Sequence, residues 1–209
     1  MFKLSIISIF IFSMTTSLFA TDWRDYPAPF PRYRKDARAC VEESCKQTWG
    51  KCKDPKVYKK IQTSCSDNWD KWCVRYLCKE GPMRTCLKPD MVSEYAAACK
   101  ENLSSTCVED MCSRVSFSFC NERKNIISFA KACQFNDGGH CIKAVCKKAP
   151  MSTCRDSAKL AEVAKSCAYN RGSRCIEDAC KKLGHFYCKK LDNLLDVAES
   201  CAVKARWPY

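Results

Sequence analysis

The sequence predicts an all-α protein, an α/α solenoid of five helix-turn-helix units of about 34 residues linked by disulfides. Three observations predict this fold. The spacing C-x4-C-x7-C-x12-C recurs five times, one residue shorter in its first copy, and its copies begin at Cys40, Cys73, Cys107, Cys141 and Cys175. All 20 cysteines belong to this pattern. Within each copy the apolar residues recur at helical spacing, and two helices in such a period are typical of α-solenoids.

Residues 1–20 have the features of a secretory signal peptide. Lys3 gives a positive start, residues 4–12 are largely apolar, and the segment ends in the small residue Ala20. This apolar run is shorter than the ~20 residues that a membrane-spanning helix needs, and no later stretch approaches that length. We therefore expect an exported protein, periplasmic or secreted, without a membrane span.

The cysteine content and the charge set further limits. Twenty cysteines in the about 189 residues that follow the expected signal peptide exceed the ~8–10 % typical of disulfide scaffolds, and an exported chain meets an oxidising compartment, so disulfides are expected. The formal net charge of +13 favours anionic partners such as nucleic acid, acidic polysaccharide, anionic lipid or an acidic protein. The other interpretation is a basic surface that only keeps the protein soluble.

Residues 21–39 differ in composition from the five-unit region at 40–209. Pro27, Pro29 and Pro31 alternate with other residues in a segment rich in aromatic and arginine side chains. Three prolines within five residues exclude a helix and favour an extended, polyproline-like arm. We expect this arm to lead into the first unit, packed on it or trailing from it, and keep a partner-binding arm as the alternative.

The first helix of each unit is expected to span about nine residues from the first cysteine. The β-branched residue after that cysteine shares one broad helical face with a residue three positions further on. Gly81-Pro82, Pro150 and Gly184 are expected to end these helices. A helix of this length is unstable alone, so it depends on its neighbours.

The second helix follows the third cysteine and is longer. Pro55 and Pro89 stand where a first helical turn accepts proline. The apolar positions then recur at i, i+1, i+3, i+4 and i+7, as over residues 160–167. In the first unit, Lys59 and Gln62 replace residues that are apolar or small in later copies, which predicts a terminal unit with a solvated outer face.

Cysteine pairing cannot be settled by sequence alone. The first two cysteines of a unit point about 140° apart on a helix, which favours different neighbours for them. The simplest scheme joins each cysteine to the one across the nearest turn, in loops of about eight residues worth roughly 2–3 kcal/mol each. The predicted pairs are Cys45–Cys52, Cys65–Cys73, Cys78–Cys86, Cys99–Cys107, Cys112–Cys120, Cys133–Cys141, Cys146–Cys154, Cys167–Cys175 and Cys180–Cys188.

This sequential scheme leaves Cys40 and Cys201 unpaired, free to meet each other or to join molecules end to end. The alternative is a nested scheme inside each unit, with Cys40–Cys65 around Cys45–Cys52 and so on. It pairs all 20 cysteines.

A partial resemblance supports the solenoid. Residues 131–141 and 165–175 resemble the K-A-C-x7-C linkage of secreted cysteine-rich proteins of the Sel-like repeat family, which are α/α solenoids distantly related to tetratricopeptide repeats. The resemblance implies a disulfide between successive units, and it covers about ten residues per unit. The glycine-rich segment of that family is missing and an extra C-x7-C replaces it. The proposed functions of the family, host-protein interaction and weak penicillin binding, have no motif residues here to carry them.

Metal chemistry and catalysis have little support in the sequence. Thiolate copper storage is the sharpest alternative, because soft thiolates select Cu(I), but the C-x3-C spacing that places thiols on one helical face is absent. His140 occupies a turn position and His185 an apolar one, so both are interpreted as structural. Neither a phosphate-binding loop nor a hydrolase motif is present. We therefore predict no enzyme, no catalytic or metal site and no cofactor.

Binding remains, because solenoids commonly bind through one continuous surface. Large side chains and lysines share the turn between the two helices of a unit, and the candidate binding residues are Trp49, Met83, Phe119, Met151, Phe186, Tyr187, Lys147, Lys148, Lys181 and Lys182. Such side chains suit a protein, a glycan or an anionic polymer. The alternative is that they only complete the core. Asn102-Leu103-Ser104 also fits an N-glycosylation acceptor.

The predicted function is a protein-interaction or structural scaffold in the cell envelope or outside the cell. The alternatives are an anionic-polymer binder that uses the basic surface and, from another class, a thiolate copper store.

Overall fold

The structure, a computed structural model, describes residues 36–202 except 83, 171 and 185, and for Phe117 only the backbone. The predicted signal peptide at 1–20, most of the arm at 21–39, Met83 and His185 thus lie outside the described residues. Within them the chain forms eleven α-helices and short 3₁₀ turns, without strands, so the predicted all-α fold is confirmed.

Each cysteine quartet corresponds to one pair of helices. The first helices are α1 (Ala37–Gln47), α3 (Trp72–Glu80), α5 (Thr106–Arg114), α8 (His140–Lys148) and α10 (Arg174–Leu183). The second helices are α2 (Pro55–Ser64), α4 (Pro89–Ala98), α7 (Arg123–Ala132), α9 (Ser157–Ser166) and α11 (Leu191–Ser200). The turns between them hold η2 (Lys51–Lys53), η3 (Thr85–Leu87), α6 (Phe117–Cys120), η4 (Thr153–Arg155) and η5 (Tyr187–Lys189).

The predicted helix boundaries hold with one exception. Pro55 and Pro89 begin α2 and α4, and Gly81 and Gly184 cap the ends of α3 and α10. The exception is α1, which begins at Ala37, inside the segment assigned to the arm. The Asp36 carboxylate accepts a hydrogen bond from the Ala39 backbone N–H at 2.9 Å, and this N-cap starts the helix before the first cysteine.

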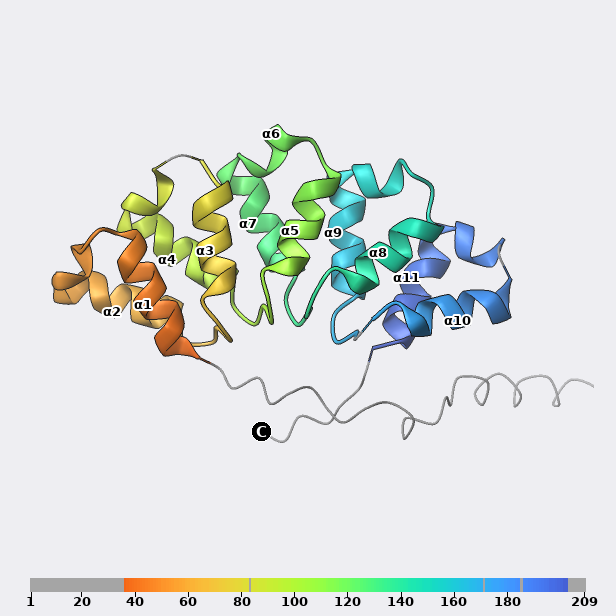
Figure 1. Cartoon of the computed structure of the whole chain (residues 1–209), viewed down its shortest axis with the longest axis horizontal. Coiled ribbons are helices and arrows are strands. Elements are labelled where there is room, and N and C mark those ends of the chain that lie inside the picture. Colours follow the sequence, from red (N-terminus) through yellow and green to blue (C-terminus); the bar gives the residue numbers. More distant parts are fainter. Residues whose placement is uncertain (1–35, 83, 171, 185, 203–209) are drawn as a thin grey trace, which may run out of the picture. The chain divides into compact units, whose positions relative to one another are not determined.

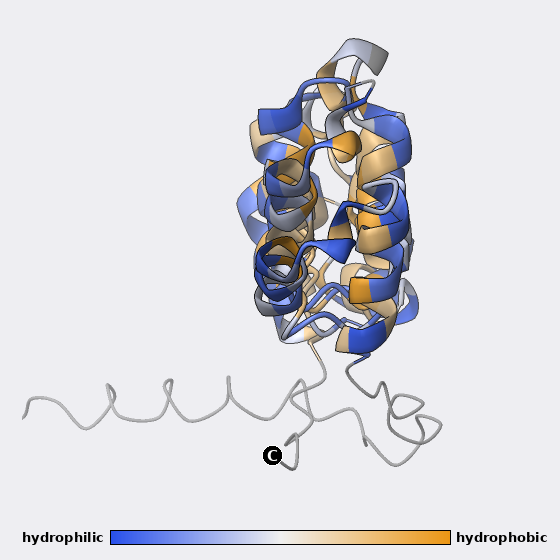
Figure 2. Cartoon of the chain, turned by 90° about the vertical axis from the view of Figure 1, so that its left-hand side faces the viewer, coloured by the Kyte–Doolittle hydropathy of each residue, from blue (hydrophilic) through white to orange (hydrophobic). Residues whose placement is uncertain are grey.

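The helices of successive units pack in two layers. Among the first helices α1 packs on α3 and α8 on α10, while the second helices pack in the order α2, α4, α7, α9 and α11 (Figure 1). Figure 2 shows the apolar stretches of the two layers facing each other. Lys59 and Gln62 are exposed on α2, which confirms the solvated outer face predicted for the first unit.

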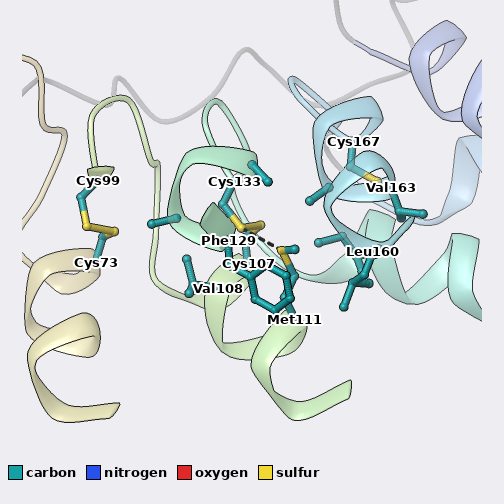
Figure 3. Packing of buried hydrophobic residues seen from close by; sticks show 14 of the residues in the cluster. Cys73, Cys99, Cys107, Val108, Met111, Phe129, Cys133, Leu160, Val163 and Cys167 are labelled. Carbon is teal, nitrogen blue, oxygen red and sulfur yellow. Dashed lines mark hydrogen bonds between the residues drawn. A yellow bond between two sulfur atoms is a disulfide. The ribbon is translucent and has the colours of Figure 1, made fainter. Parts of the chain in front are cut away.

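The core lies between the layers and is continuous from unit to unit. Its largest fully buried side chains are Tyr95, Phe129, Ile61, Leu77, Met111, Ile126, Ile142, Leu160, Ile176, Leu194, Val74 and Val92. Figure 3 shows the Phe129 ring beside Met111 and the Cys107–Cys133 disulfide. The Met111 sulfur lies 3.4 Å from the Cys133 sulfur. Disulfide sulfur is thus part of the packed core.

All 20 cysteines form ten disulfides, and the nested scheme is the one observed. The pairs within the turns are as predicted, namely Cys45–Cys52, Cys78–Cys86, Cys112–Cys120, Cys146–Cys154 and Cys180–Cys188. The first cysteine of each unit pairs with the fourth, in Cys40–Cys65, Cys73–Cys99, Cys107–Cys133, Cys141–Cys167 and Cys175–Cys201.

The predicted pairs between units, Cys65–Cys73, Cys99–Cys107, Cys133–Cys141 and Cys167–Cys175, are therefore wrong, as are the unpaired Cys40 and Cys201. The reason is the antiparallel helix pair. It brings the start of the first helix beside the end of the second, where the fourth cysteine is the C-cap residue. Both sulfurs then point into their own unit.

Asparagines, not disulfides, join successive units. Each stands three residues after a fourth cysteine, is 3 % exposed or less, and donates from its side-chain amide to a carbonyl 28 residues further on. The pairs are Asn68 to Ala96 at 3.0 Å, Asn102 to Ala130 at 2.8 Å, Asn136 to Ala164 at 3.3 Å and Asn170 to Ala198 at 3.2 Å. Burial of Asn102 also makes its predicted glycosylation incompatible with this fold.

These asparagines donate to carbonyls in the last turn of the second helices, and two of these carbonyls, those of Ala130 and Ala198, also accept from the C-cap N–H groups of Cys133 and Cys201. Each acceptor is the third residue from the end of a second helix, where the last four carbonyls lack an intrahelical partner. The acceptor is alanine in units two to five, and its small side chain leaves room for the amide. Gln62, exposed, holds this position in the first unit, which no asparagine precedes.

A column of backbone hydrogen bonds runs beside the asparagines. The N–H groups of Glu101, Phe135 and Tyr169 donate to the carbonyls of Asp67, Glu101 and Phe135, at 3.1, 2.8 and 2.8 Å. The three donor residues have φ of 58°, 58° and 61°, in the left-handed region that costs a side-chain-bearing residue energy. The Phe135 and Tyr169 rings stack with centroids 4.6 Å apart. These contacts fix the register of one unit on the next.

Replacing Asn136 by alanine is expected to lower the free energy of unfolding by about 1–3 kcal/mol, because the substitution leaves the Ala164 carbonyl buried without its donor. Denaturant unfolding followed by circular dichroism measures the loss. Asn121→Ala, at an exposed position, is the control and should change little. Equal losses in the two variants would show that the buried amide does not join the units.

Candidate functional site

The turns inside the units follow one another along one edge of the helical region (Figure 1). We call this surface the basic edge and define it as the described residues among 45–55, 78–89, 112–123, 146–157 and 180–191. These segments contain 15 Lys and Arg residues but only 4 Asp and Glu residues. The turns between units, residues 65–73, 99–107, 133–141 and 167–175, contain 4 of each kind. Most of the excess positive charge therefore lies on one edge.

Several candidate binding residues project from the basic edge into solvent. Trp49, Met151 and Phe186 are 84 %, 71 % and 83 % exposed, although they are large and apolar. Tyr187 is also exposed. Of the four candidate lysines, Lys148 is half-buried, and Lys147, Lys181 and Lys182 are exposed. For these apolar residues the interpretation as core-completing side chains does not hold.

Phe119 does not belong to this exposed set. It lies in α6, packs against the core and places its ring centroid 5.1 Å from that of Phe129. Its contribution is to packing, as the alternative interpretation of the turn residues stated. Met83 lies outside the described residues.

A groove of about 480 Å³ between α3 and α5 is a second candidate site, which was not predicted from the sequence. Trp72 and Tyr76 line one side and Glu109 and Ser113 the other, and the cysteines of the Cys112–Cys120 disulfide also line the groove. Its volume falls within the range typical of ligand pockets. The available signal was Trp72 itself, a tryptophan at a position that the other four units fill with alanine, threonine, histidine or arginine.

Trp72 is the most accessible aromatic residue of the groove. It is 49 % exposed at the first position of α3. Lys71 Nζ and Arg75 Cζ lie 5.2 and 5.4 Å from its ring centroid, within cation–π range. These cations hold the indole at the mouth of the groove, where it can pack on a partner.

Charges of both signs surround Tyr76 in the groove. Burial and, to a lesser degree, the nearby carboxylates of Glu80 and Glu109, which disfavour a phenolate, together raise the pKa of Tyr76 to about 12. Arg75 and Lys79 line the same groove. The site thus offers an aromatic wall, a phenol that stays protonated, and both positive and negative side chains.

The raised pKa predicts a pH dependence. The folded pKa of Tyr76 exceeds that of an unfolded tyrosine, so its contribution to stability is full below about pH 10 and is lost as pH rises toward 12. A rapid-mixing absorbance titration of phenolate should show a step near pH 12 that Tyr76→Phe removes, whereas Tyr95, whose pKa burial also raises, should ionise alike in both proteins. A wild-type titration without such a step, or one unchanged in the variant, would contradict the assignment.

The structure leaves no thiolate for the copper-storage alternative, because every cysteine is in a disulfide. In the described part of the chain, no group of three or more His, Cys, Asp or Glu side chains is arranged to hold a metal ion. His140 is exposed at the first position of α8, next to the turn where the sequence placed it. His185 lies outside the described residues.

Comparison of this chain with protein-family models, with curated proteins and with solved structures found no match in any of the three. The resemblance to the Sel-like family therefore stays a prediction. The disulfide between units that it implied is not the one observed, because Cys133 pairs with Cys107. What the structure defines is a class: a disulfide-rich helical protein.

Proposed function

We propose that this protein is an exported binding scaffold that holds a segment of a partner protein in the groove between α3 and α5. The observation that carries the proposal is Trp72, half-exposed at the mouth of a groove on a disulfide-linked frame. Tryptophan, tyrosine and arginine dominate the binding energy of protein interfaces, and Trp72, Tyr76 and Arg75 stand together here.

The frame around the groove favours binding by a pre-organised surface. The α3 side is fixed by Cys73–Cys99 and Cys78–Cys86, and the α5 side by Cys107–Cys133 and Cys112–Cys120. A surface that is already ordered loses little conformational entropy when a partner binds. The disulfides therefore favour binding of a partner by keeping the groove rigid.

The charged residues of the groove indicate which charges a partner segment should carry. A carboxylate of the partner would pair with Arg75 or Lys79, and a cation would pair with Glu109. An apolar side chain between them would pack on Trp72. We therefore expect an extended peptide that carries both charges around one apolar residue.

Selection from a displayed peptide library against the full chain tests this proposal. Peptides enriched on the wild-type protein should bind Trp72→Ala at least ten times more weakly, as expected for a hot-spot aromatic residue. Trp49→Ala is the matched control, because Trp49 is an exposed tryptophan outside the groove. Failure to enrich peptides, or equal losses in both variants, would reject the groove as the binding site.

A second candidate function is binding of anionic polymers by the basic edge. The observation that favours it is the excess of 15 basic over 4 acidic residues in the five intra-unit turns. Affinity for heparin, used as a probe, should fall steeply with salt. The double variant K182E/K189E should bind more weakly than K131E/K165E, which makes the same change in charge on α7 and α9.

Export is the part of the proposal that explains the disulfides. Ten disulfides are typical of proteins that fold in an oxidising compartment such as the periplasm or the extracellular space. No helix among the described residues is long and apolar enough to cross a bilayer. The signal peptide expected at residues 1–20 would deliver the chain to such a compartment.

A further inference from the structure

The last two intra-unit turns, residues 146–157 and 180–191, differ from the rest of the basic edge in combining exposed apolar side chains with a dense group of lysines. Met151 and Phe186 are 71 % and 83 % exposed, and Leu183 and Tyr187 are 38 % and 41 % exposed. Exposed apolar side chains that gather within a polar rim are typical of a site that binds a protein or a membrane.

The charge around these side chains is almost entirely positive. The two turns contain Lys147, Lys148, Arg155, Lys181, Lys182, Lys189 and Lys190. Their one acidic residue, Asp156, accepts hydrogen bonds from the Ala158 and Lys159 backbone N–H groups at the start of α9. Lys189 Nζ lies 5.7 Å from the Phe186 ring centroid, so a cation accompanies the most exposed aromatic ring.

The composition favours a lipid surface over a protein partner. Protein interfaces are depleted in lysine and enriched in arginine, whose planar fork pairs with particular carboxylates. Here six of the seven cations are lysines, compact point charges suited to a diffuse anionic surface. The apolar side chains also protrude from turns, as interfacial anchors do, whereas the groove lies between α3 and α5.

We propose that the turns at 146–157 and 180–191 dock on an anionic lipid bilayer, with Phe186 and Met151 entering the interface and the lysines meeting the headgroups. This inference rests on the second candidate function, that the basic edge binds anions, and it names the partner. Cys146–Cys154 and Cys180–Cys188 close the two turns into short loops, so the anchors are held in place before contact.

Vesicle sedimentation of the full chain tests the inference. Binding to vesicles of equal phosphatidylglycerol and phosphatidylcholine should be at least ten times tighter than binding to phosphatidylcholine alone. Phe186→Ser should weaken it about tenfold, and K182E/K189E by at least as much. The controls, Tyr58→Ser at an exposed position on α2 and K131E/K165E, should leave it within about twofold of the wild type.

Entry of the side chain at position 186 into the bilayer is measured separately. In Phe186→Trp, lipids with brominated acyl chains should quench a larger share of the tryptophan fluorescence than in the wild-type protein. Two results distinguish failure of the lipid inference from failure of the second candidate function. If Phe186→Ser binds anionic vesicles normally and brominated lipids add no quenching, the edge binds anions without entering the bilayer, and the lipid inference is overturned while the second candidate function stands. If neither heparin nor anionic vesicles bind, both fail.

Discussion

Replacing Cys107 and Cys133 together by alanine is expected to lower the free energy of unfolding by about 3.5 kcal/mol. Replacing Cys112 and Cys120 should lower it by about 2.5 kcal/mol. The chain-entropy model gives this order because the first disulfide spans 26 residues of sequence and the second only 8. Burial adds to the difference, since Cys107 and Cys133 are fully buried whereas Cys112 is half-buried. Denaturant unfolding without reductant measures both losses.

A thiol count on the same variant tests the pairing independently of stability. If the first cysteine of each unit pairs with the fourth, removing Cys107 and Cys133 leaves no free thiol. If successive units were linked instead, the same variant would expose the thiols of Cys99 and Cys141. Two reactive thiols in the folded variant, or equal stability losses for the two pairs, would contradict the connectivity described above.

Phe129→Ala is expected to cost about 3–5 kcal/mol, the usual loss when a phenylalanine is deleted from a core. The ring is 1 % exposed, lies against Phe119 and borders Met111 and the Cys107–Cys133 disulfide (Figure 3). Disulfides on either side restrict how far the surrounding helices can move, so the cavity should collapse only in part. Thermal and denaturant unfolding measure the loss.

Phe186→Ala is the matched control for this substitution, because Phe186 is 83 % exposed. Its free energy of unfolding should stay within about 0.5 kcal/mol of the wild-type value. A loss below about 1 kcal/mol for Phe129→Ala would mean that the third unit is loosely packed, contrary to its burial.

Much of the helical organisation could be predicted, because it depends on local signals. Pro55 and Pro89 marked helix starts, and Gly81 and Gly184 marked helix ends. The period of the cysteines gave the pairing of helices into units. The beginning of α1 was placed too late, because the cysteine pattern starts at Cys40 and the cap at Asp36 lies before it.

The cysteine pairing was predicted only in part. The angle between the first two cysteines of a unit on their helix indicates that they have different partners, but it does not indicate which cysteine pairs with each. That depends on how the fourth cysteine, at the end of the second helix, lies against the first, which is a tertiary property. The buried asparagines did have a sequence signal, an Asn three residues after Cys65, Cys99, Cys133 and Cys167, which went unnoticed among the cysteines and apolar positions.

The candidate binding surfaces were also predicted only where local sequence signals define them. The lysines and large apolar residues of the turns were identified from composition, and Trp49, Met151 and Phe186 are exposed as binding residues must be. Phe119 was included because it stands in a similar turn, but α6 directs its ring to Phe129. The groove at Trp72 depends on the spacing between α3 and α5, which no local pattern encodes.

Disulfides link the helices within each unit, whereas asparagine hydrogen bonds link successive units, and this difference has a mechanical consequence. In every helix pair, Cys40–Cys65 or its counterpart joins the start of the first helix to the end of the second. A force applied to the ends of the chain is therefore carried by these disulfides and can lengthen only the short connections between units. At 3.3–3.6 Å per residue, each connection of eight residue steps reaches about 30 Å, against about 120 Å for a fully reduced unit. Under tension the molecule should yield in small increments at its hydrogen-bonded joints and refold quickly once released.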